Sequence, residues 1–96
     1  MKINLKLFGP FSLIAGKRQI EMRFQKQRVS VREFLLKLNM KSRLFREYGD
    51  IELSDKLEGL LRYKIMFIIN EKQCYDIEEW IYDGDHVKIL AQITGG

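Results

Sequence analysis

The sequence predicts an α+β fold of the β-grasp type, with a mixed sheet of four to five strands and one main helix packed on one face. Two alternating segments near the start can pair as a hairpin, and a capped amphipathic segment follows them and can cross the sheet. Further strand-like segments fill the second half, the last of them just before the end of the chain. In this fold the first and last strands lie parallel in the middle of the sheet, so we expect a flexible C-terminal tail in solvent.

The hairpin is predicted from two segments of alternating polarity. Lys2 to Phe8 places Ile3, Leu5 and Leu7 on one side, and Gln19 to Phe24 places Ile20, Met22 and Phe24 on one side. The connection contains Gly9-Pro10, which ends the first strand, and a short helical turn from Phe11 to Ala15 that Gly16 closes. Phe8 is the exception, because it falls on the polar side of its strand.

The main helix is predicted from a capping box. The Ser30 hydroxyl can accept from the Glu33 amide, and the Glu33 carboxylate can reach back to the Ser30 amide. Apolar residues then recur at helical spacing, which predicts a helix from Val31 to about Met40. Between Leu44 and Arg62 the pattern is less regular, and we expect a turn at Gly49-Asp50 and a short helix from Asp55 to about Arg62.

The second half predicts three strands and a tight turn. Ile65 to Ile69 is apolar on both faces and reads as a central strand, followed by a turn at Asn70-Glu71. We expect a short return strand over Lys72 to Tyr75, with Trp80 and Ile81 packed under a loop. Asp83-Gly84-Asp85 predicts a turn before the last strand, His86 to Ala91, whose inward residues are Val87, Ile89 and Ala91.

Composition predicts one domain over residues 1–96, with 92–96 as the tail. The longest apolar run is far too short to span a bilayer, and the start lacks the apolar region of a signal peptide. One cysteine excludes an internal disulfide and suits a reducing compartment, so we expect a cytoplasmic protein that binds no membrane. The net charge of +4 leaves a small RNA-binding domain as a competing hypothesis. Because no aromatic RNA-binding motif is present, we expect no nucleic-acid partner and prefer an acidic protein partner.

Four side chains could carry chemistry, and each has a simpler interpretation. Cys74 could be a nucleophile, but we expect an inert or half-buried thiol, because no electropositive setting is evident. His86 could titrate near neutral pH, but we expect a solvated histidine at the start of a strand. Asp83 and Asp85 could hold a metal, yet Gly84 between them favours a turn, and one histidine with one cysteine cannot build a usual zinc site.

The last residues, Ile93-Thr94-Gly95-Gly96, suggest a chemical role for the tail. Two residues without Cβ give the smallest cross-section and almost any φ and ψ, which suits threading into a narrow channel. A carboxylate at Gly96 would become a good electrophile once esterified to AMP. We therefore expect Gly96 to carry the reactive group and Gly95 to help it reach a partner's site.

Several features together resemble the MoaD/ThiS family of ubiquitin-like sulfur carrier proteins. They are the first strand with Phe8, the capped helix, the Phe67-to-Asn70 strand end, the Asp-Gly-Asp turn before the last strand, and the Gly-Gly end. One departure is Glu71, since the family usually has glycine after this asparagine. The stretch from Leu44 to Arg62 is longer than a ThiS protein needs, which favours the MoaD branch or an unassigned relative.

The resemblance implies a non-catalytic sulfur donor with no bound cofactor. An adenylyltransferase of the ubiquitin-activating type would consume ATP to adenylate Gly96, and sulfur from a persulfide donor would then give a thiocarboxylate. In the MoaD branch the thiocarboxylate serves molybdopterin formation, as the small subunit beside the large subunit of molybdopterin synthase. In the ThiS branch it serves the thiazole of thiamin. A ubiquitin-related modifier joined to proteins through Gly96 remains an alternative.

Counting the faces of the strands predicts a partner-binding surface. If the alternating residues of the first, central and last strands face the helix, four apolar residues gather on the open face of the sheet: Phe8, Met66, Ile68 and Leu90. A contiguous exposed apolar patch usually marks an interaction site. The resemblance implies the same surface for the activating enzyme and the sulfur-using subunit, and we include Ile93 and Thr94 of the tail in it.

Overall fold

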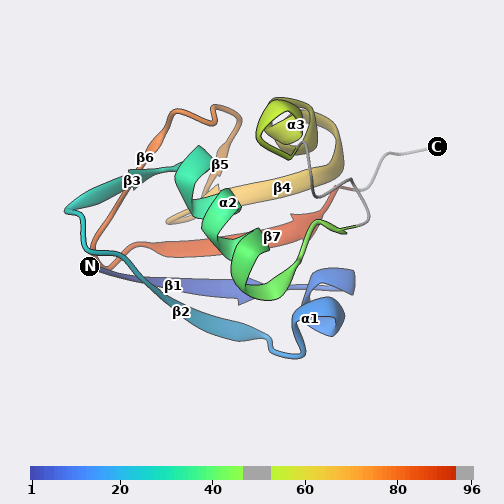
Figure 1. The fold of residues 1–96 in the computed structure, drawn as a ribbon, viewed down its shortest axis with the longest axis horizontal. Helices are drawn as coiled ribbons and strands as arrows, with labels where there is room; N and C mark the ends of the chain where they lie inside the picture. Colours follow the sequence, from blue (N-terminus) through green and yellow to red (C-terminus); the bar gives the residue numbers. More distant parts are fainter. Residues whose placement is uncertain (47–52, 93–96) are drawn as a thin grey trace.

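The computed structural model describes residues 1–46 and 53–92, and for residues 53–55 only the backbone. A five-stranded mixed sheet has the order β2-β1-β7-β4-β5, and helices cover one of its faces (Figure 1). In chain order the elements of the first half are β1 (Lys2–Leu7), α1 (Pro10–Ala15), β2 (Gln19–Arg23), β3 (Arg28–Ser30) and α2 (Val31–Ser42). Those of the second half are α3 (Leu53–Gly59), η2 (Leu60–Lys64), β4 (Ile65–Ile69), β5 (Lys72–Cys74), β6 (Trp80–Tyr82) and β7 (His86–Ala91). This arrangement confirms the predicted β-grasp.

The predicted N-terminal hairpin is present. β1 and β2 pair antiparallel with Ile3 opposite Met22, and both side chains are buried. The connection holds the short helix α1, which ends where Gly16 adopts a left-handed φ of 72° and donates its N–H to the Ser12 carbonyl. A left-handed residue is a common way to end a helix, and glycine adopts it without a steric penalty.

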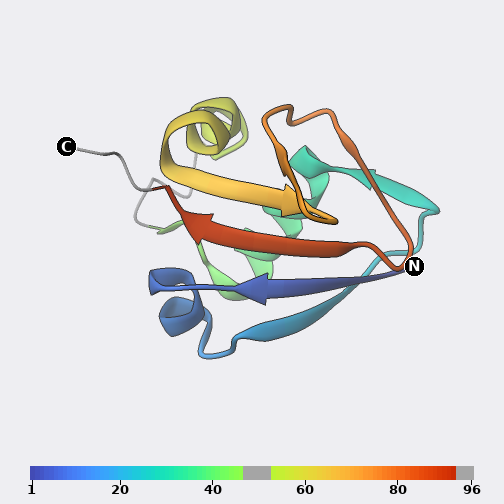
Figure 2. The ribbon, with the colours of Figure 1, turned by 180° about the vertical axis from the view of Figure 1, so that it is seen from behind.

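The last strand occupies the middle of the sheet, as predicted. β7 runs parallel to β1, with Leu5 beside Val87, and antiparallel to β4, with Phe67 beside Ile89. Figure 2 shows the open face, where β7 lies between β1 and β4. Because β1 and β7 are parallel, Phe8 and Gln92 follow them at the same end of the sheet.

The helix α2 begins as predicted and is two residues longer than expected. The Ser30 hydroxyl accepts from the Glu33 amide at 3.1 Å, but the Glu33 carboxylate binds Lys26 Nζ at 2.6 Å instead of the Ser30 amide. Half of the expected capping box is therefore present. Phe34 lies at the centre of the core, with its ring 6.0 Å from that of Phe24 and 5.7 Å from that of Phe67.

A second, two-stranded sheet corrects one expectation. Trp80 and Ile81 do not pack under a loop but form β6, which pairs antiparallel with β3. Ile81 is fully buried opposite Val29, whereas Trp80 is 39% exposed and carries the Arg28 guanidinium 3.9 Å above its ring. The alternation of a short strand explains why these consecutive residues differ so much in burial.

The second helical segment is also present, with different bounds. α3 continues into the π-helical turn η2, so Gly59 lies inside one helical path with an ordinary helical φ of −65°. Leu57, Leu60 and Leu61 are buried in the core. The expected turn at Gly49-Asp50 lies outside the described residues. In the described part of the chain, no helix is both long enough and apolar enough to cross a membrane.

Candidate functional site

The tail residues predicted to carry the chemistry, Ile93, Thr94, Gly95 and Gly96, lie outside the described residues, and so does the prediction that this segment is flexible. The structure instead defines the point from which the tail starts. After β7 the Gln92 amide donates to the Lys64 carbonyl at 2.9 Å, which extends the pairing of β7 with the chain before β4. Gln92 is half-buried, so the chain is held by the sheet up to this residue.

Four apolar residues lie on the open face, where counting strand faces predicted them. The Phe8 amide donates to the Ile89 carbonyl at 3.2 Å, which continues the β1–β7 pairing and brings Phe8 beside Leu90. Leu90 pairs with Met66, and Ile68 lies two residues further along β4. We call Phe8, Leu90, Met66 and Ile68 the apolar row. Phe8 is 41% exposed and the other three are half-buried, while their strand neighbours Leu7, Ile89 and Phe67 are buried.

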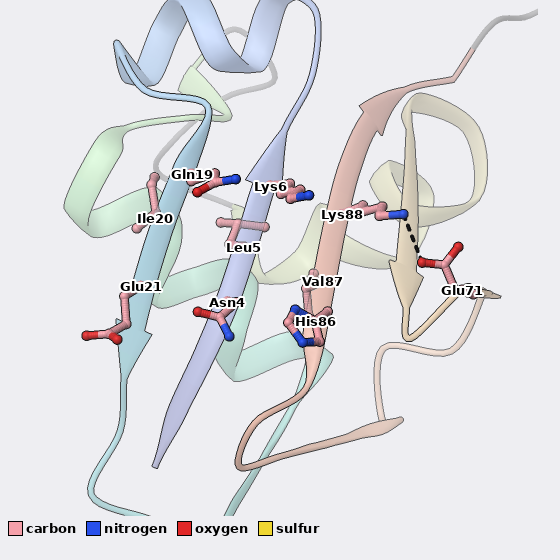
Figure 3. Close-up of a pocket in the computed structure, with 10 residues that line it drawn as sticks. All are labelled: Asn4, Leu5, Lys6, Gln19, Ile20, Glu21, Glu71, His86, Val87 and Lys88. Carbon is pink, nitrogen blue, oxygen red and sulfur yellow. Dashed lines mark hydrogen bonds and ion pairs between the residues drawn. The ribbon is translucent and has the colours of Figure 1, made fainter.

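The remainder of the open face is polar and cationic. A shallow depression crosses β2, β1 and β7, and Figure 3 shows its side chains: Asn4 and Lys6 from β1, Gln19 and Glu21 from β2, and His86 and Lys88 from β7. Lys6 and Lys88 are direct neighbours in the parallel pairing, and so are Asn4 and His86. Glu71, from the turn after β4, reaches over this surface and binds Lys88 Nζ at 2.9 Å.

The sequence did not predict that Lys6, Lys88 and Glu71 lie together. The alternation did place Lys6 and Lys88 on the polar sides of their strands, but only the register brings them side by side. Glu71 was noted only as a departure from the family pattern, with no chemistry attached to it. No pattern in the sequence predicts its contact with Lys88, because seventeen positions separate the two residues.

The two turns at the other end of the sheet are joined by a hydrogen-bond network. Asp85 accepts from the Tyr82 amide and from the Asn70 side chain, each at 2.8 Å. The Asn70 side chain in turn accepts from the His86 amide at 2.9 Å, and Asp83 accepts from the Lys2 amide at 2.7 Å. The predicted turn is confirmed, with Gly84 at a φ of 83°. These carboxylates fix loops, and no group of residues in the described ranges could hold a metal ion.

Cys74 and His86 have the surroundings expected of them. Cys74 is 8% exposed and its thiol donates to the Asp76 carbonyl at 3.2 Å. Burial raises the pKa of this thiol, and the nearby acidic side chains act in the same direction, so the thiolate is disfavoured at neutral pH. His86 is exposed at the start of β7.

Comparisons with known proteins identify the fold. No protein-family model and no curated protein matches the chain. The structure resembles small archaeal modifier protein 1 from Haloferax volcanii, with a TM-score of 0.74 and 20% identity over 100% of both chains. It also resembles a putative molybdopterin converting factor subunit 1 from Pyrococcus furiosus, with a TM-score of 0.73 and 18% identity over 97% of this chain and 99% of that one.

A third similar structure is a complex of subunits 1 and 2 of the molybdopterin-converting factor from Helicobacter pylori. There the TM-score is 0.58 and the identity 14%, over 100% of both chains. At such identities the likeness establishes the fold alone. The chain has the ubiquitin-like β-grasp fold.

Proposed function

We propose that this protein is a ubiquitin-like sulfur carrier of the MoaD type, without catalytic activity of its own. Gly96 supplies the C-terminal carboxylate, which a ubiquitin-activating-type adenylyltransferase joins to AMP at the expense of ATP. The outer sulfur of a persulfide donor then attacks the acyl adenylate and releases AMP, and a thiol reduces the S–S bond of the resulting acyl disulfide to leave a thiocarboxylate. The thiocarboxylate gives its sulfur to an acceptor enzyme such as the large subunit of molybdopterin synthase, in formation of the molybdenum or tungsten cofactor.

The observation that carries this proposal is the position of β7. It lies in the middle of the sheet, it runs parallel to β1, and it is held by pairing up to Gln92. Gly96 is the fourth residue after Gln92, and an extended segment of four residues spans at most about 14 Å. A partner that reacts with Gly96 must therefore bring its active site close to this end of the sheet.

The apolar row lies at that end and suits a partner's surface. Phe8, directly after β1, is the neighbour of Leu90, which lies one residue before the end of β7. A few residues at the centre of an interface, fully buried in the complex, can each cost about 2 kcal/mol or more of binding free energy when truncated. We infer that the adenylyltransferase and the acceptor enzyme both dock on the apolar row, and that Ile93 and Thr94 follow it into the partner.

The similar structures support the molybdenum or tungsten pathway without identifying it. Two of them are described as molybdopterin converting factors, and one is a complex of its subunits 1 and 2. A large subunit is thus a reasonable partner for this chain. A ThiS-type carrier for the thiamin thiazole is the alternative within the same chemistry.

A second candidate function is a protein modifier conjugated through Gly96. The similarity to small archaeal modifier protein 1, from both Haloferax volcanii and Methanosarcina acetivorans, favours it. Activation by adenylation is common to both functions, and only the acceptor differs. Isopeptide-linked adducts of this chain in extracts of its own cells would support the modifier function.

ATP–pyrophosphate exchange catalysed by the adenylyltransferase from the same organism tests the activation step. Deleting Gly96, or adding one alanine after it, should abolish exchange while the circular dichroism spectrum is unchanged. Phe8→Lys should raise the KM for the carrier. Met40→Lys is a matched control, because Met40 is an exposed apolar residue on α2, which covers the opposite face. Normal exchange with the Gly96 deletion would refute the proposal, and equal effects of Phe8→Lys and Met40→Lys would refute the docking surface.

A further inference from the structure

Two lysines stand side by side in the middle of the sheet. Lys6 on β1 and Lys88 on β7 are direct neighbours in the parallel pairing, and both point to the open face (Figure 3). Adjacent strands lie about 4.8 Å apart, so these two cations repel one another. Like charges directly opposite each other destabilise a sheet. The pair therefore opposes folding unless an anion lies beside it.

Glu71 supplies that anion from an unfavourable backbone position. Its carboxylate binds Lys88 Nζ at 2.9 Å, although its side chain remains 80% exposed. Its φ is 74°, in the left-handed region that only glycine adopts without cost. In this two-residue turn after asparagine, glycine is the residue that the backbone geometry favours. A glutamate at this position adds a carboxylate to the open face at some cost in stability.

The carboxylate of Glu71 interacts with Lys6, His86 and Lys88, which we call the cationic group. The hydrogen bond from Lys88 lowers the pKa of Glu71, and the charges of Lys88, Lys6 and His86 lower it further. In Figure 3 the Lys88 side chain extends to Glu71, and the Lys6 side chain lies between β1 and β7. The cationic group therefore already binds one carboxylate, that of Glu71, through Lys88. A carboxylate from another protein is a ligand of the same kind.

The cationic group is continuous with the apolar row. Leu90 follows Lys88 by two residues on β7, and Phe8, directly after β1, follows Lys6 by two residues. Residues two apart on a strand share a face and lie about 7 Å apart. A protein that covers the apolar row therefore also covers both lysines, and it must place an anion there or leave two cations desolvated.

We propose that Lys6 and Lys88, with His86 beside them, form a carboxylate-binding site that Glu71 occupies in the free protein and that an aspartate or glutamate of the docking partner occupies in the complex. The proposal rests on the docking function proposed above and specifies the partner's chemistry. Glu71 lies in a turn and is largely exposed, so it can swing away when another carboxylate takes its place. A nucleic acid fits this site less well. Glu21 lines the same depression opposite Asn4, two residues along the strand from Lys6, so an extended chain of phosphates would meet it whereas a single carboxylate between Lys6 and Lys88 would not.

The first test is a double-mutant cycle on binding to the adenylyltransferase, measured by calorimetry at constant salt. Glu71→Gln removes the competing carboxylate and should tighten binding about two- to fivefold, the usual strength of an exposed ion pair. Lys88→Met should weaken binding about tenfold, because the partner's carboxylate then loses one of the two cations that it faces. In the Lys88→Met background, Glu71→Gln should have no further effect. The matched controls Lys41→Met and Glu58→Gln, at exposed positions on α2 and α3, should bind as the wild type does.

The second test needs no partner enzyme, so it separates this proposal from the proposed function. A short N-acetylated aspartate peptide is titrated into the isotope-labelled protein, with the matching asparagine peptide as control. Amide shifts should concentrate at Lys6, His86 and Lys88, and Glu71→Gln should strengthen them. Equal shifts around Lys17 and Lys41 would contradict the proposal. Equal binding of the asparagine peptide, or of single-stranded DNA at the same residues, would also contradict it.

If the enzyme fails to activate the protein while the peptide binds as described, the proposed function fails and the carboxylate site stands. If activation occurs and Glu71→Gln weakens binding or leaves it unchanged, the carboxylate site fails and the proposed function stands.

Discussion

Two substitutions of Glu71 separate the free-energy cost of its left-handed backbone conformation from the stabilisation that its side chain provides. Asn70 and Glu71 connect β4 to β5 with φ angles of 48° and 74°, and Ile69 pairs with Lys72 across the turn. Glu71→Gln keeps the side-chain volume and the backbone cost but removes the charge that binds Lys88. Glu71→Gly removes the same charge and also the backbone cost.

The difference in the free energy of unfolding between the two variants therefore measures the backbone cost of the turn alone. A residue with a Cβ in the left-handed region costs about 1–2 kcal/mol. The greater entropy of glycine in the unfolded chain offsets about 0.5–1 kcal/mol of this. We expect Glu71→Gly to be about 1 kcal/mol more stable than Glu71→Gln, which for a domain of this size raises Tm by about 4–8 °C.

Thermal unfolding followed by circular dichroism, with urea unfolding as a second measurement, tests this value. Gly84→Ala is a useful comparison, because it introduces a Cβ at a φ of 83° in open space and should be destabilising for the same reason. If Glu71→Gly is no more stable than Glu71→Gln, the turn stores no strain. Glu71 would then occupy the turn at no cost in stability, which contradicts our inference that a carboxylate is kept there at a cost.

Three further predictions concern the core, the small sheet and the effect of acid. Phe34→Ala should lower the free energy of unfolding by about 3–5 kcal/mol in urea titrations, because a fully buried ring is lost, and a loss below about 1 kcal/mol would contradict its central place. Arg28→Ala should change the fluorescence of Trp80, the single tryptophan, with little loss of stability, whereas an unchanged spectrum would mean that the guanidinium does not lie on the ring. Because the pKa of Glu71 is lowered in the folded protein, its contribution to stability is present above its ordinary pKa of about 4.5 and is lost as the pH falls through the lower folded value. Glu71→Gln should therefore lose less stability than the wild type when the pH is lowered through this range, and parallel losses would contradict the ion pair.

Regular local patterns made most of the fold predictable. β1, β2 and β7 alternate over five or six residues, and buried residues recur with a period of two in β1. The capped start of α2 is likewise encoded within a few residues, at Ser30 and Glu33. These elements were correctly predicted because their signals are local and agree with their burial in the fold.

The parts that were missed depend on contacts between distant segments. β3 and β6 have three residues each, too few to show alternation, and each is a strand only because the other pairs with it. Phe45 is fully buried and its ring lies 6.0 Å from that of Phe11, yet no periodic pattern includes it. The Asn39 side chain turns the chain toward the core by accepting from the Phe45 amide at 2.8 Å.

In the candidate site, too, local patterns were predictable and contacts between distant segments were not. A period of two was enough to place Phe8, Met66, Ile68 and Leu90 on the open face, because each strand was correctly identified. The cationic pair and its contact with Glu71 required the register of β7 against β1 and the geometry of the β4–β5 turn. Neither can be derived from the composition of a single strand.

The proposed function depends on conversion of the Gly96 carboxylate to a thiocarboxylate. This conversion is measured most directly by the intact mass of the protein after incubation with its adenylyltransferase, ATP and a persulfide donor and subsequent treatment with a thiol reductant, with fragmentation to locate the change. The expected result is the exchange of one oxygen for one sulfur atom, confined to Gly96 and absent when ATP is omitted. An unchanged mass under conditions in which the adenylyltransferase hydrolyses ATP, or sulfur attached at Cys74 instead, would contradict it.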